Sequence, residues 1–397
     1  MDNNNYRQNL AILLITSLFF MWALTSTING ELIKHFKDSF HLSRFHAGFV
    51  DSAYYLAYFI MAIPVGIIIS KSTYKCGIYI GLILFIVGSL LFYLANIFAV
   101  YAFFLIAVFV IASGATFLET CANTYILKIG DPTTAARRLN FAQSWNGLGA
   151  VFASYYGAKM IFAGNSTNGH IYTPYLLICV ISIILIGAFL ITKLPTIKSD
   201  NDAIKINWSV LLRYRHLRNG VIAQFFYVGL QASIWGYFFF YTSKKLPYLS
   251  DIQASKYFQF SFVLFMLGRF IGSFLLSYFK PPKLLSVYAV ITIILLICTG
   301  LGSGQFAIYS LVLVSFFMSI MYPTIFSLSL KHINTDTKIA ATYMVMAVIG
   351  GAIIPPILGL LSDMHSINFG LIVPIVCAII ILYFSIFGHH CTIKEVD

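Results

Sequence analysis

The sequence predicts an all-α polytopic membrane protein, and its composition and the spacing of its apolar runs support that prediction. Of its 397 residues, 59% are hydrophobic and only 10% are charged, whereas about a quarter of the residues in a soluble globular protein are charged. A helix needs about 20 apolar residues to cross the hydrocarbon. We therefore expect about twelve spans, near residues 10–31, 47–69, 77–95, 98–126, 139–163, 172–193, 219–243, 257–279, 284–301, 305–330, 339–361 and 367–388.

Lysine and arginine residues fall unequally on alternate predicted loops, which indicates the orientation in the membrane. Seventeen lie on one side and six on the other, the six being Lys34, Lys37, Arg44, Lys244, Lys245 and Lys256. Because cytoplasmic loops are enriched in basic residues, both termini are predicted to be cytoplasmic. The same bias and attraction to lipid headgroups account for most of the formal net charge of +12, so we expect the bilayer, and no nucleic acid, as a partner.

A charged loop and an internal repeat divide the predicted spans into two halves. The longest charged internal loop runs from Lys193 to Arg218 and separates six spans from six, and a shift of 202 residues places Gly149-Ala150 on Gly351-Ala352. Parallel six-span halves with both termini on one side are typical of the major facilitator fold. We expect two pseudo-symmetric six-helix halves joined by a cytoplasmic linker, with boundaries at 1–193, 194–218 and 219–397.

Glu119 is the polar residue that is hardest to explain as membrane structure. It lies well inside the fourth predicted span, where an ionisable group is costly unless it is buried among helices or faces a water-filled cavity. On a helix it shares a face with Asn123, and the next span carries an amide at every third residue, namely Asn140, Gln143 and Asn146. Such a surface suits a polyhydroxylated ligand, and the carboxyl could hold a coupling proton. The structural alternative for Glu119 is a neutral carboxyl that is hydrogen-bonded between helices.

Two other predicted spans carry polar residues on one face. On the first, Asn29 is followed by Gly30 and Glu31, and Glu31 is either a proton-coupling group or a solvated residue at the outer interface. The seventh presents amides and aromatic rings, namely Gln224, Tyr227, Gln231 and Trp235. Since an amide beside an aromatic ring is a usual means of holding a sugar, Asn29, Gln224, Gln231, Trp235 and Tyr322 join the predicted sugar-binding residues. Arg269 is read as a snorkelling anchor or a gate residue, with the structural role favoured.

Several long blocks occur in a fixed order along the chain. They are SLFFMWAL with Asn29, SAYYLAYFIMAIPVGI, FLETCANTYIL, RRLNFAQSWNGLGA, AQFFYVGLQASIWGYF and FFMSIMYPTIFSLSLKHINTDTK. In these blocks the chain resembles the L-fucose:proton symporter family, which includes glucose/galactose relatives. The resemblance implies that Glu119 takes part in proton coupling, that Gln143 and Asn146 are the amides of the binding site, and that the protein is a monomer.

The chain departs from that family immediately after Asn29. In the family an Asp thought essential for transport follows this Asn, whereas here the residue is Gly30 and an acidic residue, Glu31, comes one step later. One residue rotates a side chain by about 100° around a helix. Glu31 is therefore not an automatic substitute.

Together these features predict a secondary transporter of a bacterial inner membrane that imports a monosaccharide with a proton by alternating access. The sugar is L-fucose-like or another hexose. An uncoupled facilitator, or an exporter of another polar metabolite, is the alternative, motivated by the missing Asp. No enzyme activity, metal site or cofactor is expected, because the predicted spans contain no histidine and no cluster of carboxylates.

Overall fold

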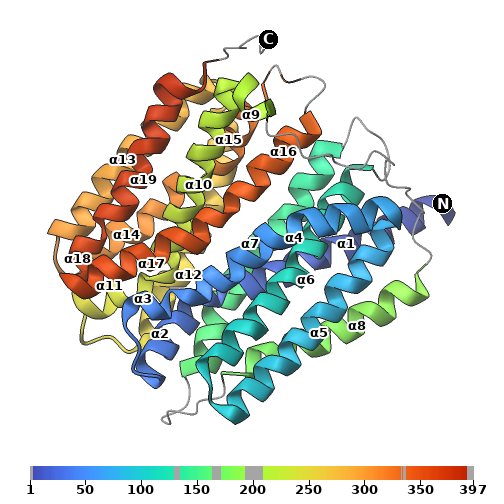
Figure 1. Ribbon diagram of the computed structural model, residues 1–397, viewed down its shortest axis with the longest axis horizontal. Coiled ribbons are helices and arrows are strands. Elements are labelled where there is room, and N and C mark those ends of the chain that lie inside the picture. The colour runs from blue at the N-terminus through green and yellow to red at the C-terminus, as the bar shows by residue number, and fades with distance from the viewer. Residues whose placement is uncertain are drawn as a thin grey trace. The chain divides into compact units, whose positions relative to one another are not determined.

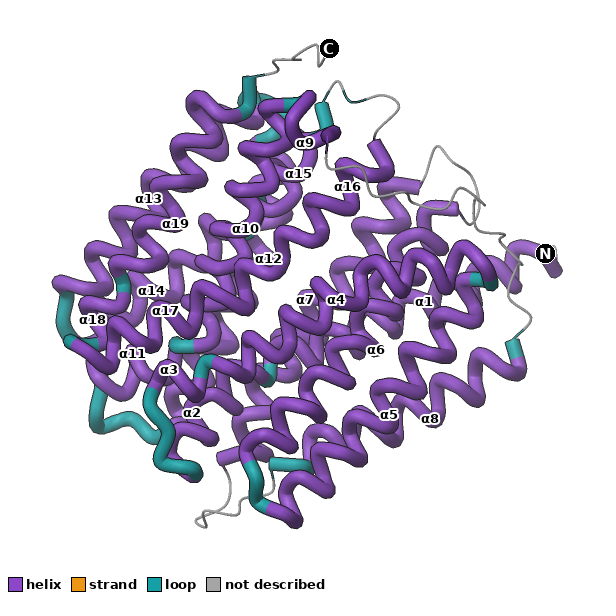
Figure 2. The backbone as a smooth tube through the Cα atoms, viewed as in Figure 1, coloured by secondary structure: helices purple, strands orange, loops and turns teal. Residues whose placement is uncertain are grey.

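A computed structural model describes residues 3–128, 135–162, 171–192, 209–331, 333 and 337–390, and nearly all of them are helical (Figures 1 and 2). Ten helical stretches in this part of the chain are long and apolar enough to cross a membrane. The fifth and seventh predicted spans are not among the ten, but they fall on helices too, namely α7 (Ala135–Phe162), and α10 (Arg215–Gly236) with α11 (Phe238–Lys245). The predicted all-α membrane fold is thus confirmed, whereas the count of twelve crossings stays a prediction.

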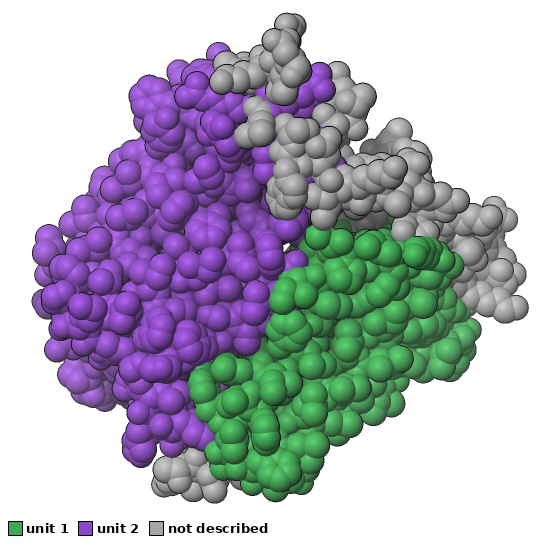
Figure 3. All heavy atoms as spheres, viewed as in Figure 1, with its two compact units in different colours: residues 1–29, 60–203 green, residues 30–59, 204–397 purple. Residues whose placement is uncertain are grey.

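One compact unit comprises residues 1–29 and 60–203 (Figure 3). Within it, α5 packs against α6 and α8, and α1 packs against both α6 and α7. A Cβ added to Gly114 would lie 2.7 Å from the carbonyl oxygen of Gly81, so α5 and α6 meet backbone to backbone, as small residues permit in membranes. The helices are α1 (Asn3–Thr27), the later part of α4 (Phe49–Lys71), α5 (Tyr74–Phe98), α6 (Tyr101–Lys128), α7 and α8 (Thr173–Ile191).

The other compact unit comprises residues 30–59 and 204–397 (Figure 3). Helix α10 is its centre, because it packs against α15, α17 and α19. Its remaining elements are α2 (Asn29–Ser39), α3 (Arg44–Ala47), the start of α4, α9 (Ser209–Arg213), α11, α12 (Asp251–Leu275), α13 (Pro281–Leu301), α14 (Gly304–Met318), α15 (Met321–Ser329), α16 (Thr337–Met346), η2 (Ala347–Ile349), α17 (Gly350–Met364), α18 (Ile367–Gly370), α19 (Ile372–Tyr383) and η3 (Phe384–Gly388).

This division differs from the one that the repeat suggests, because residues 30–59 pack with the C-terminal elements. Helix α3 lies against α17, and a Cβ on Gly236 would come within 2.5 Å of the Asp51 carboxylate at the start of α4. The predicted halves and linker stay predictions, and residues 193–208 of the linker region lie outside the described residues.

Several spans are interrupted near the residues predicted to be functional. Helix α1 gives way to α2 at Ile28, next to Asn29, and α10 gives way to α11 at Tyr237, two residues after Trp235. The tenth predicted span is broken between α14 and α15, just before Tyr322. The breaks are short, since Ile12–Ser39 and Gly304–Ser329 each still count as one membrane-length helical stretch.

Candidate functional site

Glu119 and Asn123 lie one turn apart on α6, and both side chains are half-buried. The Oδ1 atom of Asn123 is buried and has no hydrogen-bond partner among the described residues. A buried carbonyl oxygen normally has one. The Asn123 amide is therefore suited to accept a hydrogen bond from a hydroxyl of a ligand.

Helices α1 and α7 bring further predicted residues to the same unit. The Nδ2 of Asn146 donates a hydrogen bond to the Phe19 carbonyl at 3.3 Å, and a Cβ on Gly149 would lie 2.7 Å from the Phe20 carbonyl oxygen. Asn29 is buried just beyond the end of α1. Because α1 also packs against α6, the residues predicted on three separate spans belong to one group of packed helices. The side chains of Asn140 and Gln143 lie outside the described residues.

In the other unit, Trp235 on α10 and Arg269 on α12 both contact the ring of Phe265. The half-buried Trp235 donates from Nε1 to the Ser315 hydroxyl at 3.2 Å, and its ring centroid lies 5.1 Å from that of Phe265. The Arg269 guanidinium is 4.7 Å from the Phe265 ring centroid, a cation–π distance. This group presents an aromatic surface and hydrogen-bond donors together.

Tyr227 and Tyr322 complete this group from α10 and α15. Their ring centroids are 6.0 Å apart, and the Tyr227 hydroxyl donates to the Met318 carbonyl at 3.0 Å. Within the described ranges Arg269 forms no ion pair, and its Nε is buried without a hydrogen-bond partner.

Arg269 is thus a site residue that the sequence analysis undervalued. An ionisable group well inside an apolar span is a functional candidate by default, and this argument, applied above to Glu119, applies equally to Arg269. Its half-buried position beside the Phe265 ring makes it a second candidate for a functional role, and the structural role of a snorkelling anchor stays a prediction.

The two glutamines predicted on α10 differ in exposure. Gln231 is half-buried, whereas Gln224 is 0% exposed, and neither atom of its amide has a hydrogen-bond partner in the described part of the chain. Leaving a buried amide unpaired costs about 1–3 kcal/mol. Gln231 is therefore the accessible amide of the pair, and Gln224 lies beneath the surface with unmet hydrogen-bonding capacity.

Gly30 and Glu31 lie in α2, inside the second unit. A Cβ on Gly30 would lie 2.8 Å from the Trp235 carbonyl oxygen and 3.1 Å from the Phe258 ring. Glu31 is 0% exposed, and neither carboxyl oxygen has a hydrogen-bond partner among the residues described. The structure therefore places Glu31 in the protein interior and not at a solvated interface.

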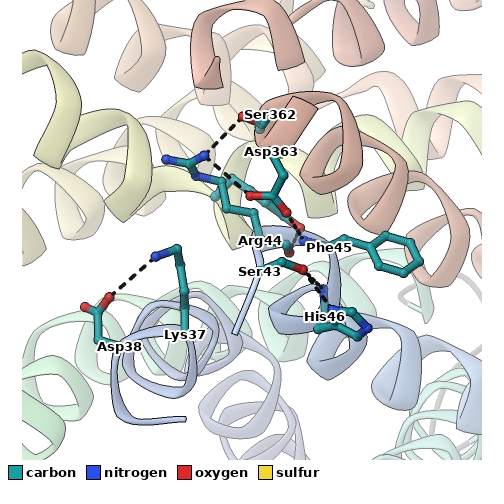
Figure 4. A network of polar contacts seen from close by, with 9 residues as sticks. Lys37, Asp38, Ser43, Arg44, Phe45, His46, Ser362 and Asp363 are labelled. Atoms are coloured by element: carbon teal, nitrogen blue, oxygen red, sulfur yellow. Dashed lines mark hydrogen bonds and ion pairs between the residues drawn. The ribbon is translucent and has the colours of Figure 1, made fainter. Parts of the chain in front are cut away.

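Helix α3 is held on α17 by a polar network (Figure 4). Nη1 of Arg44 donates to the Ser362 carbonyl at 3.1 Å and lies 3.5 Å from Oδ1 of Asp363. The backbone N–H of Phe45 donates to Oδ2 of Asp363 at 2.9 Å, and the Tyr237 hydroxyl donates to the Arg44 carbonyl at 2.7 Å. We call the contacts of Arg44 and Phe45 with Ser362 and Asp363 the α3–α17 clamp.

A pocket of about 160 Å³ lies elsewhere, between α1, α7 and α8, and it is lined by Ser17, Phe20, Met21, Trp145, Ile181 and Leu185. The Ser17 hydroxyl already donates to the Leu14 carbonyl at 2.7 Å. The pocket contains none of the predicted site residues. Its apolar lining offers few partners for a polyhydroxylated ligand, so we place the site on the polar helix faces instead.

Comparison with known proteins agrees with this fold over nearly the whole chain. Residues 11–355 match the profile of the Major Facilitator Superfamily. The chain is 36% identical to the L-fucose-proton symporter of Escherichia coli (strain K12) over 402 residues, which cover 94% of this chain and 92% of that protein. It is also 36% identical to a glucose/galactose transporter of Brucella abortus biovar 1 (strain 9-941) over 387 residues, covering 95% and 94%.

Solved structures show the same similarity. A crystal structure of the E. coli fucose:proton symporter FucP superimposes with a TM-score of 0.71 at 35% identity, covering 96% of this chain and 99% of that chain. A bacterial homologue of the human lysosomal transporter Spinster superimposes with a TM-score of 0.80 at 14% identity, covering 98% of both chains. The second likeness concerns the fold alone.

Proposed function

The chain belongs to the Major Facilitator Superfamily, and on this premise we propose that it is a proton-coupled sugar transporter that imports L-fucose or another hexose. The proteins similar to it over more than nine-tenths of its length are named for L-fucose or for glucose and galactose. Transport proceeds by alternating access, in which the sugar site opens first to one side of the membrane and then to the other.

Polar residues in each repeat half are the candidate ligands of the sugar, and each half is considered by itself. In the N-terminal half, the amides of Asn29, Asn123, Asn140, Gln143 and Asn146 hydrogen-bond to its hydroxyls, since an amide both donates and accepts. In the C-terminal half, Trp235 packs against a C–H face of the sugar ring, and Gln231, Tyr322 and the newly found Arg269 supply hydrogen bonds. Gln224, whose amide is buried, can join them only when the packing above it opens. The half-buried exposure of Trp235, Gln231 and Arg269 supports this assignment.

Glu119 and Glu31 carry the coupling proton. The observation that carries this proposal is the position of Glu119, half-buried inside an otherwise apolar span and one turn from the unpaired Asn123 carbonyl. A carboxyl there is costly when ionised and cheap when protonated. A sugar hydroxyl bound at Asn123 would lie near it, so binding of the sugar and of the proton would influence each other.

We further propose that the protein works as a monomer in a bacterial inner membrane, with both termini in the cytoplasm. The bias of seventeen to six in the basic loop residues supports this orientation. It puts α2, α3 and the start of α4 at the external side.

The test is sugar uptake by proteoliposomes under an imposed inward proton gradient, with L-fucose, D-galactose and D-glucose and a pH-sensitive dye inside. We expect accumulation of one sugar against its gradient, together with proton entry. Exchange without accumulation would overturn the coupling and favour the uncoupled facilitator, for which Gly30 in place of an acidic residue is the motivating observation. No movement of any of the three sugars would overturn the substrate class.

A further inference from the structure

The pocket of about 160 Å³ between α1, α7 and α8 has no part in the proposed transport mechanism. Five of its six lining side chains are apolar or aromatic, and the sixth, Ser17, donates its hydroxyl hydrogen to the Leu14 carbonyl at 2.7 Å. A buried water needs about two to four polar partners, and apolar cavities of about 150 Å³ in other proteins stay dry and accept apolar guests. The pocket therefore suits a hydrocarbon ligand.

The three helices also present exposed apolar side chains close to the pocket. Leu13 on α1, Leu148 on α7 and Ile184 on α8 are 54%, 51% and 63% exposed, and each lies within four residues of a lining residue. Trp145, which lines the pocket, is ten residues from the start of α7, or about 15 Å along the helix. Large apolar side chains exposed at this depth face the lipid. The molecules within reach of the pocket are therefore the hydrocarbon chains of the bilayer.

The pocket continues as a narrower crevice along the same three helices. A second cavity, of about 20 Å³, is lined from α1 by Leu24 and Ile28. The lining residues of α1 thus run from Ser17 to Ile28 in successive turns, over about 16 Å. Gly157 on α7 helps to keep this part open, because a Cβ there would lie 3.2 Å from the Ile28 side chain. An elongated apolar crevice suits an extended chain better than a compact ligand.

We propose that one acyl chain of a membrane phospholipid occupies this crevice and contacts Trp145 and Phe20 in the pocket. The chain supplies the dispersion contacts that the wall atoms of an empty pocket would lack. It also removes an internal void, and voids in packed helices are destabilising in proportion to their volume. The surrounding bilayer provides the chain, so the site needs no soluble ligand.

The occupied pocket borders the α1–α7 contact of the candidate site. Trp145 and Phe20 line the pocket, whereas their sequence neighbours Asn146 and Phe19 join the two helices through the hydrogen bond of 3.3 Å. Consecutive residues point about 100° apart around a helix, so the acyl chain and the Asn146 amide lie on different faces of the helix pair. The lipid thus completes the packing behind Asn146 without occupying the place of the sugar.

The experiment measures contact between Trp145 and brominated acyl chains, since a bromine atom quenches indole fluorescence at van der Waals distance. The full-length protein is given Trp145 as its single tryptophan by Trp22→Phe, Trp208→Phe and Trp235→Phe. It is placed in bilayers of phosphatidylethanolamine and phosphatidylglycerol whose acyl chains are either unmodified or brominated near the methyl end.

Two substitutions then distinguish the pocket from the surrounding lipid. Ser17→Phe adds a ring inside the pocket, and Leu13→Phe, one turn earlier on α1, adds a ring on the exposed face as the matched control. Ile181→Phe fills the pocket from α8 and tests the same point by a second route. An unchanged thermal unfolding midpoint shows that each variant is folded.

We expect brominated lipid to lower the Trp145 fluorescence at least twofold in the parent and in Leu13→Phe, and to have less than half that effect in Ser17→Phe and Ile181→Phe. Equal quenching in all variants would show that Trp145 meets only the lipid around the protein and would overturn the inference. Absence of quenching in the parent would overturn it too, because the pocket would then be empty. The measurement uses neither sugar nor a proton gradient, so its outcome is independent of the proposed function.

Discussion

Asp363 should carry most of the strength of the α3–α17 clamp, because it contacts two groups of the opposite segment at once. Asp363→Ala removes the hydrogen bond from the Phe45 N–H, which is 2.9 Å long, and the Arg44 ion pair at 3.5 Å. A hydrogen bond to a charged group contributes about 1.5–3 kcal/mol, and a partly exposed ion pair contributes about 0.2–1 kcal/mol. The carboxylate is 25% exposed, so we take the lower ends and expect the packing of α3 on α17 to weaken by about 2 kcal/mol.

This energy predicts a graded series of variants. At about 1.4 kcal/mol per factor of ten, Asp363→Ala should speed labelling of Ser52→Cys by about thirtyfold. Asp363→Asn keeps an oxygen that can accept from Phe45 and should speed it by only about threefold, and Arg44→Ala should have a similarly small effect. When labelling is slower than reclosing, the rate follows the population of the open form.

The assay is modification of Ser52→Cys in intact cells by a membrane-impermeant maleimide, quantified by mass spectrometry, because the Ser52 hydroxyl donates to the Ala352 carbonyl of α17 when the segments are packed. Tyr248→Cys, at a residue that is 68% exposed, is the reference for thiol reactivity. The double variant of Arg44→Ala with Asp363→Ala should label at least as fast as Asp363→Ala, and the difference measures the Arg44 hydrogen bond to the Ser362 carbonyl, because the ion pair is already lost. If Asp363→Ala labels at the parental rate while it is expressed and exchanges sugar normally, the clamp does not stabilise the closed arrangement and the reasoning is wrong.

Three further predictions concern the site. Glu119→Gln should abolish accumulation against a gradient while sugar exchange continues, because an amide cannot release a proton, and unchanged accumulation in proteoliposomes would contradict the coupling role. Gly30→Ala should speed Ser52→Cys labelling about tenfold. The new Cβ would lie 2.8 Å from the Trp235 carbonyl oxygen, and overpacking of this kind costs about 1–3 kcal/mol. Labelling at the parental rate would show that the contact relaxes freely. Trp235→Ala should raise the KM for sugar at least tenfold, because it removes about 1.5–3 kcal/mol of apolar burial. Its control is Ser315→Ala, which removes only the hydrogen-bond partner of the indole N–H and should raise the KM less than threefold.

The membrane fold could be predicted from the sequence because the bilayer leaves a chain few choices. Backbone groups cannot stay unpaired in hydrocarbon, so an apolar run of sufficient length becomes a helix. The twelve predicted runs accordingly fall on helices, although the ends differ: the eighth predicted span, 257–279, is observed as Asp251–Leu275, with a Ser250 capping box that lengthens it at the start. Helical periodicity likewise placed Glu119 and Asn123 on one face of α6.

The neighbours of each helix face could not be predicted in the same way. Periodicity relates residues of one helix and contains no information about the elements that pack against it. Whether Glu31 is solvated or buried depends on the packing of α2. Likewise, only the Trp235 carbonyl beside Gly30 shows that a larger residue at this position would be crowded. Arg269 is similar, because only the packing of α12 shows that its Nε atom is buried without a hydrogen-bond partner among the described residues. Local hydrophobicity thus determines where this chain crosses the membrane, whereas long-range side-chain packing determines which of its few polar groups are buried, paired or accessible.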